Sequence, residues 1–176
     1  MARRKLHYQE ISRLAPLLRA GKLSPVELTE AILERVEKLD PCLHAYARVT
    51  ADEARAAARA AEASIRRGDY LGPLHGIPLA VKDLFWTQGV VTAAGTTVHG
   101  DFVPAEDSTV VRRLRDAGAI ILGKLQMTEG AFATHHPTIA PPVNPWGADH
   151  WTGASSSGSG VATAAGLCCA SLGTDT

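Results

Sequence analysis

Two short apolar segments separated by a helical segment constrain the fold of this chain more than any other feature. Residues 79–81, Leu-Ala-Val, follow a stretch rich in glycine and proline and have the length and composition of a buried strand. Residues 119–122, Ala-Ile-Ile-Leu, predict a second strand. Between them, residues 108–117 place apolar and charged side chains at helical spacing, and Gly118 ends the pattern. This strand–helix–strand succession predicts an α/β fold.

Helix start signals dominate the first seventy residues. Ser24 is a candidate N-cap, a proline follows at the first helical position, and Glu27 completes a capping box for a helix that should end near residues 40–41. Thr50 opens a second capping-box pattern before an alanine-rich segment that stops at Gly68. We therefore predict a mostly helical amino-terminal region.

The second half of the chain is more irregular. Residues 135–145 are rich in proline and predict a surface loop within the domain, because apolar and Gly-rich segments resume directly after it. Residues 153–160 predict a Gly/Ser loop, residues 161–167 an apolar helix, and residues 169–172 a third strand.

The charge balance and the cysteines argue against several classes of protein. Eighteen basic and eighteen acidic side chains give a formal net charge of +0, which favours neither nucleic acid nor an anionic membrane as partner. Cys42, Cys168 and Cys169 fit neither a disulfide framework nor a zinc site. The start of the chain lacks the apolar core of a secretory signal, and the apolar stretches fall short of the ~20 residues of a membrane span. These observations predict a reduced, cytoplasmic protein.

The serine-rich segment at residues 153–160, Gly-Ala-Ser-Ser-Ser-Gly-Ser-Gly, has several interpretations. A flexible linker is disfavoured because an apolar helix follows at once. A phosphate-binding loop is disfavoured because the segment lacks Gly-Lys-Ser/Thr, and Thr163 stands where a dinucleotide-binding motif has its third glycine. A structural helix cap and a reactive serine both remain open.

Lys82 directly follows the first predicted strand. Burial there would lower the pKa of its ammonium group, and a neutral lysine can act as a general base. The alternative is an ion pair with the adjacent Asp83 at the strand end. Among weaker candidates, His135 and His136 would bind a metal only with distant partners, and an exposed loop pair is the alternative. The adjacent cysteines are expected to pack as small apolar residues.

Five motifs in a fixed order carry more information than Lys82 or a serine alone. They are Gly-Pro-Leu-His-Gly-Ile-Pro-Leu-Ala-Val-Lys-Asp-Leu-Phe at residues 72–85, Ala-Ile-Ile-Leu-Gly-Lys at 119–124, Asn-Pro-Trp at 144–146, the serine-rich segment at 153–160, and Leu-Gly-Thr-Asp-Thr at 172–176. This succession resembles the amidase-signature family across residues 6–176, which is essentially the whole chain.

The resemblance implies a mixed, mostly parallel sheet core covered by helices, with residues 1–176 as the amino-terminal portion of a single amidase-signature domain. It implies a Ser-Ser-Lys triad that needs no metal or organic cofactor. Lys82 would be the base, and Ser155, held after a cis peptide bond to Ala154, would pass it a proton from the nucleophile. The family's nucleophilic serine follows a Gly-Thr-Asp-x-Gly-Gly-Ser motif, so it is expected beyond Thr176.

The resemblance also marks residues around this triad. Ser156, Asp175 and Thr176 are expected near the oxyanion site, where backbone N–H groups stabilise the developing negative charge. Met127 is a candidate substrate-binding residue, and His75 lies in another segment that resembles a pocket-lining region. For both, core packing is the alternative.

The serine-rich segment departs from the family pattern at two positions. The family usually has Gly-Gly-Ser-Ser-Gly-Gly-Ser, so Ala154 and Ser157 stand where glycines are usual. A cis bond that does not involve proline costs ~3 kcal/mol, and Ala154 adds a methyl group to accommodate. We interpret both departures as subfamily variation.

The expected activity is hydrolysis of a small carboxylic-acid amide to the acid and ammonia through a serine acyl-enzyme, the reaction of a C–N hydrolase acting on linear amides. One alternative is the A subunit of the tRNA-dependent glutamyl/aspartyl amidotransferase, a glutaminase that channels ammonia to a partner subunit. Another is a catalytically dead fragment, and the 176-residue chain alone is expected to be inactive. The expected partner is a small-molecule amide, with no membrane and, outside the amidotransferase alternative, no nucleic acid. A homo-oligomer remains open.

Overall fold

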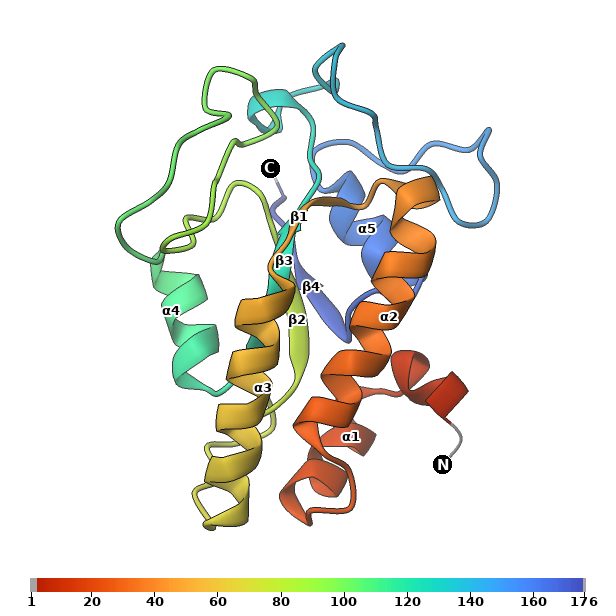
Figure 1. Ribbon diagram of the computed structural model, residues 1–176. Coiled ribbons are helices and arrows are strands. Elements are labelled where there is room, and N and C mark those ends of the chain that lie inside the picture. The colour runs from red at the N-terminus through yellow and green to blue at the C-terminus, as the bar shows by residue number, and fades with distance from the viewer. Residues whose placement is uncertain (1–2, 176) are drawn as a thin grey trace.

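Helices surround a four-stranded sheet in the computed structural model, which describes residues 3–175 (Figure 1). Along the described chain the elements are η1 (Arg3–Tyr8), α1 (Ile11–Arg19), α2 (Pro25–Leu43), β1 (Tyr46–Val49), α3 (Ala51–Arg66), β2 (Pro78–Lys82), α4 (Thr109–Asp116), β3 (Ile120–Leu125), η2 (Glu129–Ala131), α5 (Ser157–Ala164) and β4 (Ala170–Leu172). The α/β class and the helical amino-terminal region are both confirmed.

The sheet has the order β1-β3-β2-β4. β2 runs parallel to both of its neighbours, β3 and β4, whereas β1 is antiparallel to β3. The predicted mixed, mostly parallel sheet is therefore confirmed. Every residue of β2 and β3 is buried, which explains why these segments are almost continuously apolar in the sequence.

Alternate residues of the central strands belong to different parts of the core. Ala80 and Leu122 pack with residues of α2, α3 and α5 in one hydrophobic cluster. Val81 and Ile121 pack with Val111 of α4 in another cluster. This division follows from the pleat, which points successive side chains to opposite faces. In Figure 1, α2 and α3 accordingly run side by side over the sheet, and α4 lies apart from them.

The two predicted capping boxes have different outcomes. Ser24 caps α2 as expected, because its hydroxyl accepts hydrogen bonds from the N–H groups of Val26 and Glu27 at 3.0 and 3.2 Å. α3 also forms where predicted, but the Thr50 side chain makes no cap hydrogen bond. Its hydroxyl donates instead to the carbonyl of Ile121 in β3, at 3.4 Å. The capping role predicted for Thr50 was therefore wrong.

The sequence predictions miss all or part of three elements. α5 begins at Ser157, inside the segment predicted to be a Gly/Ser loop. β3 continues past Leu122 to Leu125, and β1 was not predicted at all. Three of the four β1 residues are exposed, so this edge strand lacks the apolar pattern that identifies buried strands. Across the described residues, no helix is both long and apolar enough to cross a membrane.

A buried ion pair joins β3 to the segment that follows β2. Lys124 Nζ lies 3.1 Å from Asp83 Oδ1, and both side chains are buried. The ammonium group also donates to the Phe85 carbonyl at 2.8 Å and to the Thr92 hydroxyl at 2.7 Å. Burial lowers the pKa of Lys124 and raises the pKa of Asp83, while their mutual attraction opposes both shifts. The pair therefore holds the segment between residues 83 and 92 against β3.

We expect Lys124→Met to lower the free energy of unfolding by about 3–5 kcal/mol, because it leaves the Asp83 carboxylate buried without its partner. Urea unfolding followed by circular dichroism measures the change. The double variant Lys124→Met with Asp83→Leu should recover most of the loss, because it removes both charges. Arg67→Met, which breaks an exposed pair with Asp69, is the control and should leave the transition nearly unchanged. Equal losses in the single and double variants would contradict the prediction.

Candidate active site

Lys82 ends β2 with a fully buried side chain. Its ammonium group donates to three hydroxyl groups, those of Ser155 at 2.9 Å, Ser156 at 3.1 Å and Thr174 at 2.6 Å. The serines come from the turn before α5, and Thr174 comes from the segment after β4. Because β2 and β4 are parallel neighbours, the residues that follow β4 lie near the end of β2 that carries Lys82. The fold thus gathers residues more than seventy positions apart.

The surroundings of Lys82 shift its protonation equilibrium toward the neutral form. Burial lowers the pKa of the ammonium group, and no charged partner opposes this shift in the described chain. The alternative of an ion pair with Asp83 is wrong, because that carboxylate pairs with Lys124. Among the described residues, Lys82 therefore has only hydroxyl partners, and hydroxyl groups can both donate protons to a neutral amine and accept them from it.

Ser155 and Ser156 are not equivalent in this arrangement. The Ser156 hydroxyl accepts from Lys82 Nζ and from the Thr174 N–H at 3.1 Å, and it donates to the Thr174 carbonyl at 3.0 Å. A hydroxyl has one proton and two acceptor positions, so Ser156 is fully used. Within the described chain, the Ser155 hydroxyl bonds only to Lys82, which leaves its proton and one acceptor position available. Ser155 is thus the serine that can exchange protons with a further group.

The backbone before α5 differs from the expectation in one respect. Residues 3–175 contain no cis peptide bond, so the expected cis bond between Ala154 and Ser155 was wrong for this structure. The turn closes instead through the Ser157 N–H, which donates to the Ala154 carbonyl at 3.2 Å. Gly158 then packs against other backbone, where an added Cβ would lie 2.5 Å from the carbonyl oxygens of Ala45 and Gln126. Such close contact explains why helix α5 starts with small residues.

The residues expected around the triad lie at different depths. Ser156 contacts Lys82, as described above, and Asp175 is exposed next to Thr174. Thr176 lies outside the described residues. The side chain of Met127 is fully buried, which fits core packing better than contact with a substrate. Sequence reasoning missed Thr174 as a partner of Lys82, although it belongs to a recognised Gly-Thr-Asp motif.

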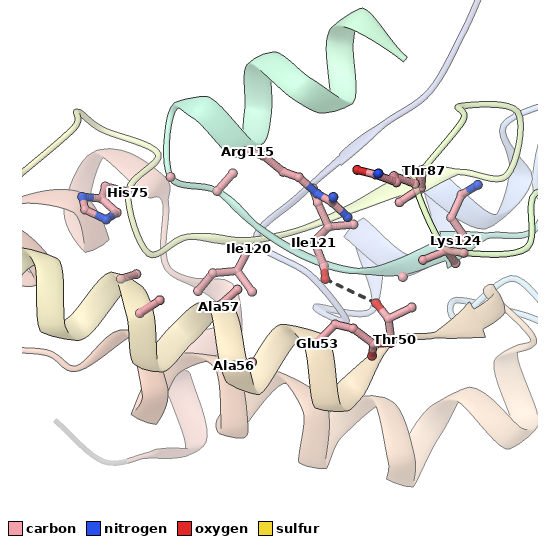
Figure 2. Close-up of a pocket in the computed structure, with 18 of the residues that line it drawn as sticks. Thr50, Glu53, Ala56, Ala57, His75, Thr87, Arg115, Ile120, Ile121 and Lys124 are labelled. Carbon is pink, nitrogen blue, oxygen red and sulfur yellow. Dashed lines mark hydrogen bonds between the residues drawn. The ribbon is translucent and has the colours of Figure 1, made fainter. Parts of the chain in front are cut away.

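His75 belongs to a separate hollow. A cavity of about 740 Å³ lies between α3 and α4 over β3, and Figure 2 shows His75 at one end of it and Lys124 at the other. The His75 ring is buried against Gly118, where an added Cβ would lie 2.5 Å from Cδ2 of the ring. Neither Lys82 nor Ser155 lines this cavity, so His75 is not part of the site around Lys82.

The remaining candidates provide neither a metal site nor a reactive thiol in the described part of the chain. No group of three or more His, Cys, Asp or Glu residues within it could hold a metal ion. His135 and His136 instead bond to hydroxyl groups of Ser157 and Thr138, respectively. Burial raises the pKa of both Cys168 and Cys169 to about 12, so both stay protonated at neutral pH.

Comparison with known proteins identifies the family to which this chain belongs. Residues 27–176 match the model of the family described as Amidase. The chain belongs to the amidase family. The resemblance that the five motifs predicted is therefore confirmed.

Individual relatives are similar to this chain over almost its whole length. The protein named "Putative amidase AmiD" from Mycobacterium tuberculosis is 57% identical over 95% of this chain. The A subunit of a glutamyl-tRNA(Gln) amidotransferase from Halorhodospira halophila is 45% identical over 97% of it. The solved native peptide amidase from Stenotrophomonas maltophilia has 36% identity and a TM-score of 0.83 over 92% of it. The chain spans 35%, 36% and 35%, respectively, of the lengths of these amidase-like proteins.

We expect Gly158→Ala to disturb the site and destabilise the protein, because the new Cβ would meet three backbone atoms within 2.6 Å. The matched control is Gly160→Ala in the same helix, where the nearest atom to the new Cβ is 3.8 Å away. That change should raise stability by ~0.5–1 kcal/mol, since alanine is the better helix former. Thermal unfolding of the two variants measures the contrast, and similar melting temperatures for both would contradict it.

Proposed function

We propose that this chain is the amino-terminal portion of an amidase that hydrolyses a small carboxylic-acid amide to the acid and ammonia through a serine acyl-enzyme. The observation that carries the proposal is Lys82, which is buried, has no carboxylate partner in the described chain, and contacts three hydroxyl groups. A lysine with a lowered pKa beside a serine is suited to general-base catalysis. Membership of the amidase family supports the same reaction class.

In the proposed reaction, Lys82 and Ser155 act together as a proton relay. As the nucleophilic serine attacks the amide carbonyl, its proton passes to Ser155, and the Ser155 proton passes to neutral Lys82. Lys82 then returns a proton to Ser155, and Ser155 passes its own proton to the leaving nitrogen, which departs as ammonia. In the second half-reaction, water attacks the acyl-enzyme in the place of the serine, and the acid is released from the nucleophilic serine. These steps use no metal or organic cofactor, and we place the nucleophilic serine beyond Thr176.

The assignment of the relay to Ser155 rests on hydrogen-bond capacity. The Ser156 proton is committed to the Thr174 carbonyl, so Ser156 would lose that bond if it took part in proton transfer. Its role in the proposal is to hold Thr174, and with it the segment expected to carry oxyanion-hole N–H groups through Asp175 and Thr176. The backbone of that segment is where the tetrahedral intermediate would be stabilised.

A free-standing hydrolase is favoured over an amidotransferase by the degree of similarity. Identity to the M. tuberculosis relative is 57%, against 45% for the amidotransferase protein from H. halophila. The altered serine turn and the irregular segment at residues 134–142 favour the same choice. In the proposed function the partner is therefore a small-molecule amide.

The first test uses the protein expressed from its coding region extended past Thr176. Lys82→Met and Ser155→Ala should each reduce kcat for a simple amide by about 10²–10⁴-fold, the usual contribution of general acid–base catalysis. Lys38→Met, a change at an exposed lysine, is the control and should leave kcat unchanged. The 176-residue chain itself should release no acid. Full turnover by the Lys82→Met variant would refute the role of Lys82, and turnover by the short chain would refute the placement of the nucleophile.

The second test separates the two amidase-family functions. We expect the extended protein to hydrolyse small amides alone, with neither tRNA nor an amidotransferase partner protein present. Ammonia release from glutamine is measured in parallel, with and without glutamyl-tRNA together with that partner. Ammonia release that needs the partner would instead support the amidotransferase function.

A further inference from the structure

The structure brings His135, in the proline-rich loop, against Ser157, the first residue of α5. Nε2 of His135 lies 3.1 Å from the Ser157 hydroxyl oxygen. Ser157 is fully buried and His135 is half-buried. Within the described chain this is the only hydrogen bond of the Ser157 hydroxyl, and it joins residues 22 positions apart. Ser157 is also one of the two positions where the serine turn departs from the usual glycine.

The protonation of the ring determines which group donates in this contact. Burial lowers the pKa of His135, and an interaction with the Met127 backbone opposes that shift only in part. The ring is therefore neutral at neutral pH, with one nitrogen available as an acceptor. Nδ1 has no well-formed hydrogen bond in the described structure, whereas Nε2 faces the Ser157 hydroxyl. We assign Ser157 as the donor and Nε2 as the acceptor.

The contact lies at one end of the turn that holds Lys82. The N–H of Ser157 closes this turn. The N–H of Gly158, the next residue, donates to the Gln126 carbonyl at 3.0 Å and anchors the start of α5. Ser155 and Ser156, which precede these anchors, contact Lys82. A glycine at position 157 would have no side chain with which to tie the turn to the proline-rich loop.

We propose that His135 is a positioning residue of the candidate active site. Its hydrogen bond to Ser157 fixes the turn so that the hydroxyls of Ser155 and Ser156 stay on Lys82. A contribution of this hydrogen bond to catalysis rests on the proposed function. Its effect on the position of the turn does not. A direct nucleophilic role for the His135–Ser157 pair is disfavoured because no substrate can reach the fully buried Ser157.

The test measures how often Lys82 becomes accessible in the 176-residue chain. An amine-reactive reagent is added under native conditions, and mass spectrometry follows the labelling of Lys82 and of Lys124, which is equally buried and lies outside the turn. His135→Ala and Ser157→Ala should each raise Lys82 labelling about 5-fold, as loss of one hydrogen bond from a local opening equilibrium predicts. Lys124 labelling should stay unchanged. The double variant should resemble each single variant, because both remove the same bond.

Two further variants complete the test. His135→Gln should retain slow Lys82 labelling, because the amide oxygen can accept from Ser157. His136→Ala is the control, since the neighbouring ring bonds only to Thr97 and Thr138 in the described chain. Unchanged Lys82 labelling in His135→Ala, or an equal rise at Lys82 and Lys124, would overturn the proposal. No outcome depends on turnover, so failure here is distinct from failure of the proposed function.

Discussion

The site depends on a division of partners between two buried lysines. A buried ammonium group needs compensation, and Asp83 lies directly beside Lys82 in the sequence. Lys124 takes that carboxylate, together with the carbonyl of Phe85 and the hydroxyl of Thr92. Lys82 is left with hydroxyl groups alone among the described residues, and these do not stabilise its charge as a carboxylate would. The ion pair thus supports the segment after β2 and leaves Lys82 without a carboxylate partner among the described residues, as the proposed proton relay requires.

The second constraint is close backbone packing at the start of α5. Gly158 packs against the backbone of Ala45 and Gln126. Helix α5 therefore begins in close contact with the start of β1 and the end of β3. Small side chains are needed there for steric reasons, and three serines add hydroxyl groups without adding bulk. The same composition that resembles a flexible linker in the sequence is held by backbone contacts and hydrogen bonds in the structure. Ser156 also fixes the position of Thr174, because its hydroxyl donates one hydrogen bond to the Thr174 backbone and accepts another from it.

Strong local signals were sufficient for much of the fold. The apolar segment before Lys82 and the capping box at Ser24 specified β2 and α2, because burial and capping act on neighbouring residues. Elements that depend on distant partners were missed. β1 exists because it pairs with β3, and Thr50 bonds to Ile121 instead of capping α3. The start of α5 was misplaced because glycine and serine have weak helix propensity, which tertiary packing overrides here.

The sequence alone determined the α/β class, the family, and the prominence of Lys82 and Ser155, because these rest on residue types at particular positions along the chain. It left open whether Lys82 pairs with Asp83 and which hydrogen bonds the hydroxyl groups of Ser155 and Ser156 make. Only the tertiary structure decided those points, since both depend on which groups from distant parts of the chain come within hydrogen-bonding distance of each other. Thr174, for example, lies 92 positions from Lys82 along the chain and yet accepts a hydrogen bond from it. Parallel pairing of β2 with β3 and β4 brings such groups together, and no local pattern encodes that proximity.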